Sequence, residues 1–515
     1  MSTHFNSPNW QSNRGKSVFT VINNLIKALF KEGNHTKRVV YLDVYETIKK
    51  AVESGMIPQG TQLPPTRILA DQLNLSRSTI VKAYNLLTEN KLLNTRQGSG
   101  FFVAETNKIK ASLPEETAGY PTISEVGESF LHNIHILNNT AVEGVAFTPG
   151  LPPLDIFPIG QWQKLSNLYW RNIKTSDLNY SISSGINSLK ENIANYLLLT
   201  RKIKCDPAQI MIVSGSLQSL YLVGNVLIDK GDVVYMENPT FPNVISIFKS
   251  LRAQVVPVSI DSEGLRIDKM TDIPGKSPKL VHVTPSNQYP MGGKMSRERR
   301  LQLLNWANQH NAMIIENDYE HEINNWHDPV ESVFSLDRQQ RTIYLGTFNR
   351  TLHPSIRLGY MILPPYLLPA VKALQMHSHR FVPQSVQAVM TDFIRQNLIY
   401  KHLRKVIEEA ADRKELFLSL FEKYFEDSPV SGESGITIRN VDNSSFHLVA
   451  ELADEVDDEK LVSALERKGI ITHALSKCYI EAEKKRGLIL GYSCINRGFM
   501  AQFVARMAGV YLGKG

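Results

Sequence analysis

Short runs rich in β-branched residues, separated by longer amphipathic stretches, constrain the fold of this chain more than any other feature of its sequence. Near-continuous apolar runs of this length are typical of strands buried on both faces of a sheet. Amphipathic stretches at 216–228 and 296–310 predict helices between such strands. The alternation therefore predicts an α/β domain with a largely parallel sheet. The runs are QIMIVSG, DVVYMENP, AQVVPVSI, KLVHVTP, AMIIEND, TIYLGTF and IRLGYMIL.

Length and composition narrow the class of protein. The chain has 515 residues, more than one compact core supports, so two or three domains are expected. An apolar fraction of 42% and a charged fraction of 21% exclude collagen-like and wholly disordered chains. The chain has a polar start and no apolar run long enough to cross a bilayer, which predicts a cytoplasmic protein without a membrane partner. Cys205, Cys478 and Cys494 lack metal-ligand spacing, so we expect neither disulfide nor metal chemistry.

Shifts in composition divide the chain into parts. The polar start contains one amphipathic piece, Val18 to Phe30, which predicts a short helix. The polar stretch ASLPEETAGYPT, with its two prolines, predicts a linker. A long helix is expected from about Pro383 to Phe425, followed by a strand (SFHLVAEL), a helix (DDEKLVSALERKG), two more strands and a closing helix. The predicted parts are an N-terminal extension (1–36), a basic segment (37–103), a linker (104–148), a large α/β domain (149–382) and a long helix with a small α+β domain (383–515).

The basic segment carries more than half of the net charge. Between Lys37 and Val103 nine Lys or Arg stand against five Asp or Glu, while the whole chain has a formal charge of +7. A surplus of this kind suits a polyanionic partner, although it also occurs on ordinary solvated surfaces. The charge needs support from geometry before it indicates nucleic-acid binding.

Three short helices are predicted in the basic segment. The first covers 41–54 and ends at Gly55, and the second starts at Pro64 and Pro65 with Ile68, Leu69 and Leu73 on its apolar face. Ser76 is suited to cap the third. A tight turn before the third helix is typical of a helix-turn-helix.

The third helix divides into two faces on a helical wheel. Ser78, Lys82 and Asn85 fall on one side, and Ile80, Tyr84 and Leu87 fall on the other. A recognition helix in the major groove needs this division, because its apolar side docks on the protein and its short polar side approaches base edges. Arg77 and Thr79 stand at the end of the helix that enters the groove. The following stretch NTRQGSGFFV predicts a hairpin whose Gly98-Ser99-Gly100 tip reaches phosphates or a minor groove.

The stretch from Gly55 to Val103, with its LP-x-x-R-x-LA, SR-x-T and G-x-G-x-x-V patterns, resembles the winged-helix domain of GntR-type transcription regulators. The resemblance implies that Arg67 and Arg77 contact bases or phosphates. It also implies that Ser78, Thr79 and Lys82 line the groove and that Gln97 with Gly98 makes the wing contact. For Lys82 and Gln97 the alternative of an ordinary solvated side chain stays open.

The chain from about residue 145 to 515 resembles the fold-type I aminotransferase domain of the MocR subfamily. This resemblance implies an N-terminal winged helix-turn-helix, a linker and a fold-type I PLP-transferase-like domain, where PLP is pyridoxal phosphate. Such a domain has a large α/β part with a mostly parallel sheet and a small C-terminal α+β part. The motifs are LDIFPIGQW, SGSLQSL, ENPTF, TPSNQYPMG, ENDYEHE and LGTFNRTLHPSIRLGY.

Three departures from the family pattern fall on the groups that PLP chemistry needs. The family lysine of GTFSKTL corresponds to Arg350 in GTFNRTL, and a permanently protonated guanidinium cannot form the aldimine. The family aspartate corresponds to Asn317, whose amide offers no charge to the pyridine nitrogen. Asp318 replaces it only if the strand end shifts by a residue. Ile489 falls near the usual carboxylate-binding arginine.

Other residues match the family pattern. Arg357 corresponds to the phosphate-binding arginine, Ser216 opens a helix whose N-terminus favours an anion, Phe241 is placed to stack on a planar ring, and Tyr319 corresponds to the tyrosine that meets the phenolic oxygen. Phe241 and Tyr319 are alternatively core aromatics kept for packing. An inward Arg357 without an anion is an unpaired buried charge, so a bound anion is hypothesised there.

These observations predict a DNA-binding transcription regulator. A homodimer is expected to bind double-stranded operator DNA, with the aminotransferase-like domain as a dimerisation and effector-sensing module without transaminase activity. The expected effector is a small anion such as an amino acid or a PLP-like molecule. Two alternatives stay open: a PLP-dependent aminotransferase with an appended DNA-binding domain, and a regulator that binds PLP non-covalently. PLP is implied by the resemblance alone, its covalent binding is excluded at Arg350, and a protein with no cofactor is the remaining possibility.

Overall fold

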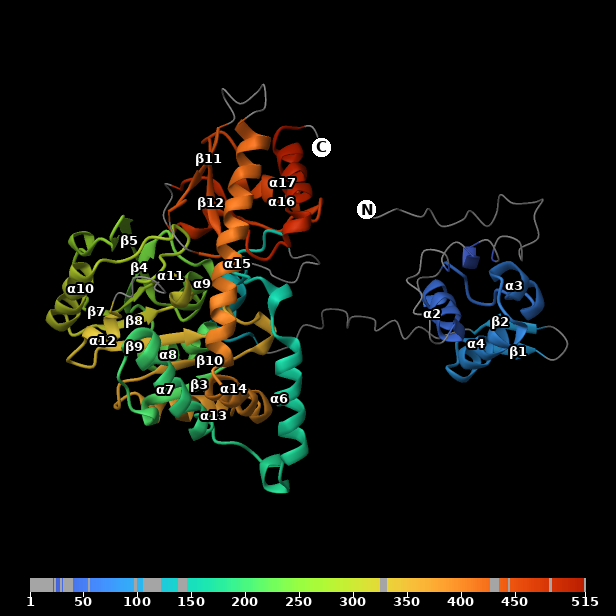
Figure 1. The fold of residues 1–515 in the computed structure, drawn as a ribbon, viewed down its shortest axis with the longest axis horizontal. Helices are drawn as coiled ribbons and strands as arrows, with labels where there is room; N and C mark the ends of the chain where they lie inside the picture. Colours follow the sequence, from blue (N-terminus) through green and yellow to red (C-terminus); the bar gives the residue numbers. More distant parts are fainter. Residues whose placement is uncertain are drawn as a thin grey trace. The chain divides into compact units, whose positions relative to one another are not determined.

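A computed structural model describes residues 22, 25–27, 30, 40–53, 56–96, 100–104, 122–137, 146–324, 331–426, 435–442, 445–480 and 484–513. The chain forms two compact units, residues 1–122 and residues 123–515 (Figure 1). None of the helices in the described residues has the length and apolar character needed to cross a membrane.

The first unit is a winged helix. Three helices are followed by an antiparallel hairpin, as the sequence predicts. The apolar side of the third helix, with Ile80, Tyr84 and Leu87, is fully buried. Ile22 and Ile26, from the predicted N-terminal helix, are buried in the same cluster, so part of the extension belongs to this core. The elements are α2 (Val40–Glu53), α3 (Thr66–Leu73), α4 (Arg77–Glu89), β1 (Leu93–Arg96) and β2 (Gly100–Val103).

Capping sets the turn between α3 and α4. α3 ends at Asn74, which adopts a left-handed conformation (φ 55°) that asparagine tolerates. Ser76 then caps α4, its hydroxyl accepting a hydrogen bond from the Thr79 amide at 3.2 Å, as expected. The prediction for Ile68 is wrong: its side chain is 44% exposed, because the short α3 turns only Leu69 and Ala70 fully into the core.

The second unit is built on a mostly parallel sheet, which confirms the predicted fold class. The strand order is β3-β10-β9-β8-β7-β4-β5-β6. Strands β9, β8, β7, β4 and β5 are parallel, whereas β10 runs antiparallel to β3 and β9, and β6 runs antiparallel to β5. Every predicted strand of this sheet is present, and of its strands only the short β6 was not expected. The strands are β3 (Ile210–Val213), β4 (Val233–Asn238), β5 (Gln254–Asp261), β6 (Gly264–Leu265), β7 (Pro278–Val283), β8 (Met313–Asn317), β9 (Thr342–Thr347) and β10 (Gly359–Ile362).

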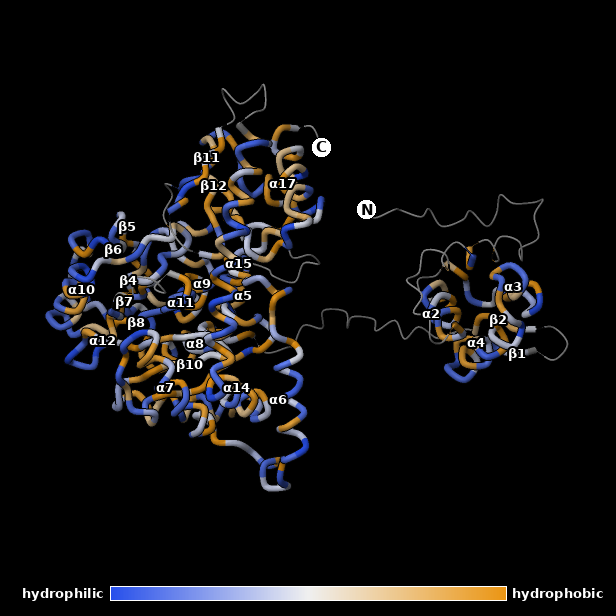
Figure 2. Tube along the Cα trace, viewed as in Figure 1, coloured by the Kyte–Doolittle hydropathy of each residue, from blue (hydrophilic) through white to orange (hydrophobic). Residues whose placement is uncertain are grey.

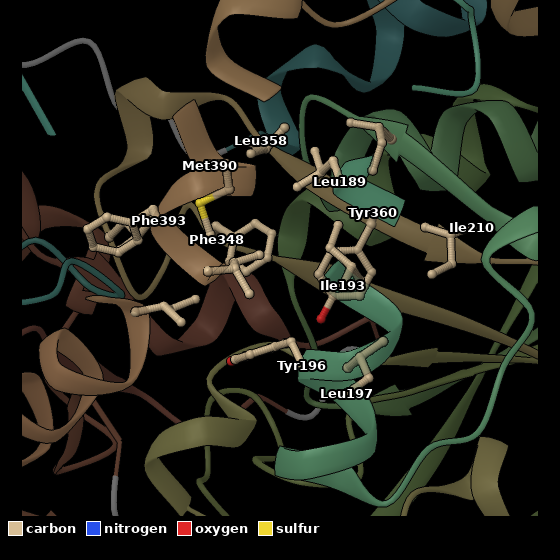
Figure 3. Packing of buried hydrophobic residues seen from close by; sticks show 14 of the residues in the cluster. Leu189, Ile193, Tyr196, Leu197, Ile210, Phe348, Leu358, Tyr360, Met390 and Phe393 are labelled. Atoms are coloured by element: carbon tan, nitrogen blue, oxygen red, sulfur yellow. The ribbon is translucent and has the colours of Figure 1, made fainter. Parts of the chain in front are cut away.

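Helices cover both faces of this sheet. Apolar clusters lie under α8, α9 and α13 on one face, and under α7, α14 (Gln384–Arg395) and α10 on the other. Figure 3 shows the cluster around α7, in which Ile193 and Tyr196 pack near Tyr360 and Phe348. The outer helix α10 is mainly hydrophilic (Figure 2). The helices are α6 (Ile159–Asn172), α7 (Asn187–Arg201), α8 (Ser216–Leu227), α9 (Pro242–Ser250), α10 (Arg297–Gln309), α11 (His321–Asn324), α12 (Val333–Leu336) and α13 (Leu368–Ser378).

The long helix expected over 383–425 is two helices. They are α14 (Gln384–Arg395) and α15 (Leu398–Phe421), separated at Asn397, whose φ of 58° breaks the helical path. The small α+β part follows, with an antiparallel sheet of order β11-β12-β14-β13. Its elements are β11 (Ile436–Arg439), β12 (Leu448–Leu452), α16 (Asp458–Glu466), β13 (His473–Ala474), β14 (Gly487–Leu490) and α17 (Arg497–Tyr511).

The described part of the predicted linker contains a helix, α5 (Glu125–Asn133), that packs on α9. The Ser129 hydroxyl donates to the Lys249 carbonyl at 3.3 Å, and the Ser246 hydroxyl donates to the Asn133 carbonyl at 3.0 Å. At the end of the predicted linker, Phe147 pairs with Gly491 in an isolated antiparallel β-bridge next to the small sheet. The exact domain borders stay a prediction.

Candidate functional site

The candidate site is a cavity of about 520 Å³ where the parallel strands reach their carboxyl ends. Ligands of open α/β sheets bind at this edge. Asn317 closes β8, Thr347 closes β9, and Ser216 begins α8 directly after β3. The segment from Thr148 to Leu151 supplies a further wall. The cavity therefore brings together residues from the end of the linker, the large sheet and the small α+β part.

Arg350 lies in this cavity, on the loop after β9. Its guanidinium carbon is 5.7 Å from the ring centroids of both Phe241 and Tyr319. Its Nη1 is 3.8 Å from Oε1 of Glu320, and 26% of the side chain is exposed. Gly150 lies so close that a Cβ atom there would be 1.0 Å from Nη1. The cation is thus enclosed by two aromatic rings, a carboxylate and a backbone segment.

Glu320 is the buried counter-charge of Arg350. Its other oxygen, Oε2, accepts hydrogen bonds from the Asn287 side-chain amide at 3.2 Å, and from the Ser445 hydroxyl and the Phe446 amide at 3.3 Å each. Burial raises the pKa of Glu320, and the charge of Arg350 opposes that rise. These contacts hold the carboxylate behind the cavity wall.

Asn317 presents a neutral amide to the cavity. Its Nδ2 lies 3.4 Å from Nε2 of the buried His282. Burial lowers the pKa of His282 to about 3, so this imidazole is neutral and accepts from the amide. Asp318 lies on the opposite face of the sheet, where Arg201 Nε donates to it at 2.8 Å. Since strand side chains alternate between faces, no shift brings Asp318 to the cavity in this structure.

Three aromatic side chains form one wall of the cavity. Phe241, at the start of α9, stacks on Tyr289 with ring centroids 3.6 Å apart and 10° between the planes. Tyr319 meets Phe241 edge-on at 5.0 Å. The Tyr319 hydroxyl is buried and has no hydrogen-bond partner among the described residues. Ile489, which falls near the family's carboxylate-binding arginine in sequence, packs in the same buried cluster, so this position is apolar.

An anion cradle lies on the other side of the cavity. α8 starts at Ser216 after Gly215, whose φ of 145° suits glycine, and a helix N-terminus offers free amides to an anion. Arg357 lines the cavity and donates to the Ser214 hydroxyl at 3.4 Å. The expectation that Arg357 is buried is wrong: it is exposed, because it ends the short helix η6 (Pro354–Ile356) in a left-handed conformation at the rim.

The residues expected to contact DNA lie on the winged helix. Arg67, Arg77, Ser78 and Lys82 are exposed, on α3 and α4. Thr79 is half-buried, and its hydroxyl is 2.7 Å from that of Ser76, so it supports the cap of α4. The Lys82 ammonium lies 6.0 Å from the Tyr41 ring centroid. Gln97 and Gly98, predicted at the wing tip, lie outside the described residues.

Sequence reasoning missed several residues of the cavity. Tyr289 stands in the motif TPSNQYPMG, and Glu320 stands in ENDYEHE, so the motifs contained a signal for both. Gly150 and His473 carried no such signal, because they reach the cavity from the end of the linker and from β13. Contacts between segments this far apart in sequence leave no local pattern.

Two protein families match this chain. Residues 159–487 match the family described as aminotransferase class I and II, and residues 40–103 match the bacterial regulatory proteins of the gntR family. The first match covers more than half of the chain, and the second covers the winged helix. The gntR match lies in the first unit, and the aminotransferase match lies in the second.

Curated relatives resemble the chain over nearly its whole length. A probable rhizopine catabolism regulatory protein, MocR, of Rhizobium meliloti is 30% identical over 92% of this chain and 94% of its own length. The HTH-type transcriptional regulator TauR of Rhodobacter capsulatus is 27% identical over 90% and 94%. The HTH-type pyridoxine biosynthesis transcriptional regulator PdxR of Corynebacterium glutamicum is 25% identical over 89% and 93%.

Solved structures share the fold of the second unit. An archaeal alanine:glyoxylate aminotransferase aligns with a TM-score of 0.66 at 22% identity, covering 76% of this chain and 96% of its own. A multiple substrate aminotransferase from Thermococcus profundus aligns with a TM-score of 0.64 at 23% identity, covering 78% and 98%. At this level of identity the alignments establish the fold.

Proposed function

The chain belongs to the MocR-type transcription regulators, which join a gntR-family DNA-binding domain to a class I and II aminotransferase domain, and we propose that its aminotransferase-like domain senses a small anionic effector without catalysing transamination. The winged helix binds operator DNA, and occupancy of the cavity changes that binding. The proposal depends on Arg350, which places a guanidinium in the cavity where an aminotransferase needs an amine.

Arg350 supports the loss of transaminase chemistry. Formation of an aldimine with PLP needs a primary amine, and the described residues that line the cavity include no lysine. A guanidinium stays protonated at biological pH and does not attack an aldehyde. The cavity therefore does not fit PLP as a covalently held cofactor, and no catalytic step is assigned to it.

Asn317 supports the same proposal independently. An electron-accepting pyridine ring needs a carboxylate that keeps its nitrogen protonated. Asn317 faces the cavity with an amide whose neighbour, His282, is neutral, so neither group supplies that charge. Non-covalent binding of a PLP-like molecule remains compatible with both residues.

Charge supports an anionic effector. The described residues that line the cavity include Arg350 and Arg357 but no Asp or Glu. Ser216, at the start of α8, adds a helix N-terminus. An amino acid or a phosphorylated ring meets these requirements through its anionic groups.

For the DNA-binding role we propose contacts from α4 and its neighbours. Arg77 stands at the first turn of α4, and Ser78 and Lys82 extend its exposed face. Arg67 lies on α3, where it is suited to a phosphate or base contact. Thr79 supports the helix start, and Gln97 with Gly98 is proposed for the wing contact.

We also propose that the regulator is a homodimer. Helix α6 lies at one side of the second unit (Figure 1). Apolar side chains remain exposed along this helix and the segment that follows it. Exposed apolar side chains gathered in one segment of the chain favour a protein interface. The exposed apolar residues are Ile159, Leu168, Trp170, Leu178, Tyr180 and Ile182.

The decisive experiment adds PLP to the full chain and to the variant Arg350→Lys. The wild-type protein should show no lysine-aldimine absorbance band, no adduct after borohydride reduction and no transaminase turnover. The Arg350→Lys variant supplies an amine at the same position and serves as the positive control for the optical signal. A borohydride-fixed adduct at a cavity residue of the wild-type chain, or turnover that disappears in Arg350→Ala, would favour the aminotransferase with an appended DNA-binding domain.

A further inference from the structure

We infer that the cavity selects a planar aromatic acid: a ring ligand that carries a carboxylate beside Arg350 and a second anionic group at the start of α8, in preference to the corresponding aldehyde. The inference rests on the proposed function, because it names the ligand class of the same cavity. It follows from four features of the cavity.

The guanidinium of Arg350 has unused donors. Its nearest carboxylate oxygen, Oε1 of Glu320, is 3.8 Å from Nη1, which is beyond hydrogen-bond distance. No hydrogen bond to this guanidinium occurs within the part of the chain that the structure describes. A guanidinium has five N–H groups arranged to match the two oxygens of a carboxylate. A ligand carboxylate in the cavity completes this arrangement.

Glu320 cannot take the place of that carboxylate. Its Oε2 is held by the Asn287 amide, the Ser445 hydroxyl and the Phe446 amide, at 3.2 to 3.3 Å. These bonds fix the side chain behind the wall, so it stays at its present distance from Arg350. Glu320 lowers the cost of holding the cation in a partly buried place, and it leaves the outward donors free.

The aromatic wall fits a planar ring. Phe241 and Tyr319 line the cavity beside the guanidinium, and aromatic faces favour stacked or edge-on rings. The Tyr319 hydroxyl points to the same conclusion, because it is buried without a partner among the described residues and needs a polar substituent on the ligand. A volume of about 520 Å³ accommodates a substituted ring.

The second anionic group is placed by α8. Ser216 begins this helix, and Arg357 lines the same side with the Ser214 hydroxyl as its partner at 3.4 Å. The two arginines of the lining meet no Asp or Glu among the described lining residues. His473 adds no charge, because burial and the nearby Arg350 lower its pKa to about 4. A ligand with two anionic groups supplies hydrogen-bond acceptors to both arginines.

The same features disfavour an aldehyde. An aldehyde is neutral, so it forms no charge-assisted hydrogen bond with the open donors of Arg350, and no amine in the described lining converts it to a covalent adduct. A carboxylate at the same ring position forms charge-assisted hydrogen bonds with the guanidinium. A cavity with an amine at this position reacts with an aldehyde, whereas the cavity with the guanidinium of Arg350 binds an acid.

The test uses three pyridine phosphates that differ only at the ring position beside Arg350: a carboxylate, the aldehyde of PLP and an alcohol. Calorimetric titration of the full chain should give the carboxylate at least about tenfold higher affinity than either neutral probe. In Arg350→Gln this preference should disappear. The control Arg266→Gln, at an exposed ion pair outside the cavity, should keep the wild-type ranking.

The outcomes separate this inference from the proposed function. Equal affinity for the carboxylate and the alcohol in the wild-type chain, or a preference that survives Arg350→Gln, would overturn the inference alone. If none of the probes binds, or if neither Arg350→Gln nor Arg357→Gln alters binding, the cavity is not the effector site and the proposed function fails as well. The wild-type ranking needs no variant, so it tests the inference even where a substitution impairs folding.

Discussion

The guanidinium of Arg201 donates to the carboxylate of Asp318 at 2.8 Å, and both side chains are fully buried. The hydroxyl of Tyr344 donates to the same carboxylate oxygen at 2.7 Å. Burial raises the pKa of Asp318, but the charge of Arg201, acting together with His321 and the hydrogen bonds from Ser286 and Tyr344, outweighs that effect and keeps the pKa below its usual value. The acid next to Asn317 is therefore committed to the far face of the sheet, and it cannot replace the missing charge in the cavity.

Removing the cation of this pair should strongly destabilise the second unit. Arg201→Met leaves Asp318 ionised and buried, with an expected loss of about 3–5 kcal/mol in the free energy of unfolding. The control Arg266→Met breaks an exposed pair with Asp268 and should cost less than about 1 kcal/mol. Urea midpoints of the two variants provide the comparison, and equal midpoints would contradict the structural role of Arg201.

Arg77 should contribute to specific binding of operator DNA. Arg77→Ala removes an exposed cation at the first turn of α4 and should weaken specific binding by about 1–3 kcal/mol. Lys50→Ala, at an exposed position on α2, removes the same charge and controls for general attraction to phosphates. Fluorescence anisotropy with operator and scrambled DNA measures both. If the two variants lose the same affinity for both DNAs, α4 is not the recognition helix.

The exposed face of α6 should form the dimer contact. Trp170→Glu places a charge among the exposed apolar residues of α6 and should shift the full chain toward the monomer. Lys164→Glu, at an exposed polar position on the same helix, should leave the mass unchanged. Light scattering coupled to size-exclusion chromatography gives the mass of each variant. A dimer that persists in Trp170→Glu would exclude this face.

His447 should make the second unit less stable in acid. Burial, with a smaller contribution from Arg350, lowers its pKa to about 4, and its ring donates through Nε2 to the Pro290 carbonyl at 3.1 Å. As the pH falls below about 6.5, His447 takes up a proton in the unfolded chain, whereas in the folded chain it stays neutral until the pH nears about 4. Stability from this residue is therefore complete above about pH 6.5 and declines by roughly 3 kcal/mol as the pH falls to about 4.

The variant His447→Gln tests this dependence. Glutamine does not titrate, so the thermal midpoint of the variant should fall less steeply between about pH 6.5 and 4 than that of the wild-type chain. Melting curves at several pH values give both slopes. An unchanged slope would assign the acid sensitivity to other buried groups.

The parallel sheet could be predicted from sequence because its strands are buried on both faces. Such strands are near-continuous apolar runs, and here they are rich in β-branched residues. β6 and β11 were not predicted, since β6 has only two residues and β11 is a half-exposed strand next to polar stretches. The break at Asn397 was also missed, because a single left-handed asparagine interrupts the helical path without changing the apolar pattern.

The candidate site was predictable only in part. Arg350 and Asn317 stand at the ends of strands in matched motifs, which placed them in one cavity. The exposure of Arg357 was not foreseen, because it follows from the backbone conformation of one residue. The partner of Arg350 was missed as well, since Glu320 and the residues that fix it come from separate loops.

Nη1 of Arg350 fills the place that a side chain at residue 150 would take, because a Cβ atom at Gly150 would lie 1.0 Å from that nitrogen. The backbone that enters the aminotransferase-like domain therefore rests directly on the cation. A ligand that displaces the guanidinium is therefore expected to remove a contact from the backbone at residue 150. Binding of a ligand at Arg350 is in this way linked to the position of the backbone around Gly150.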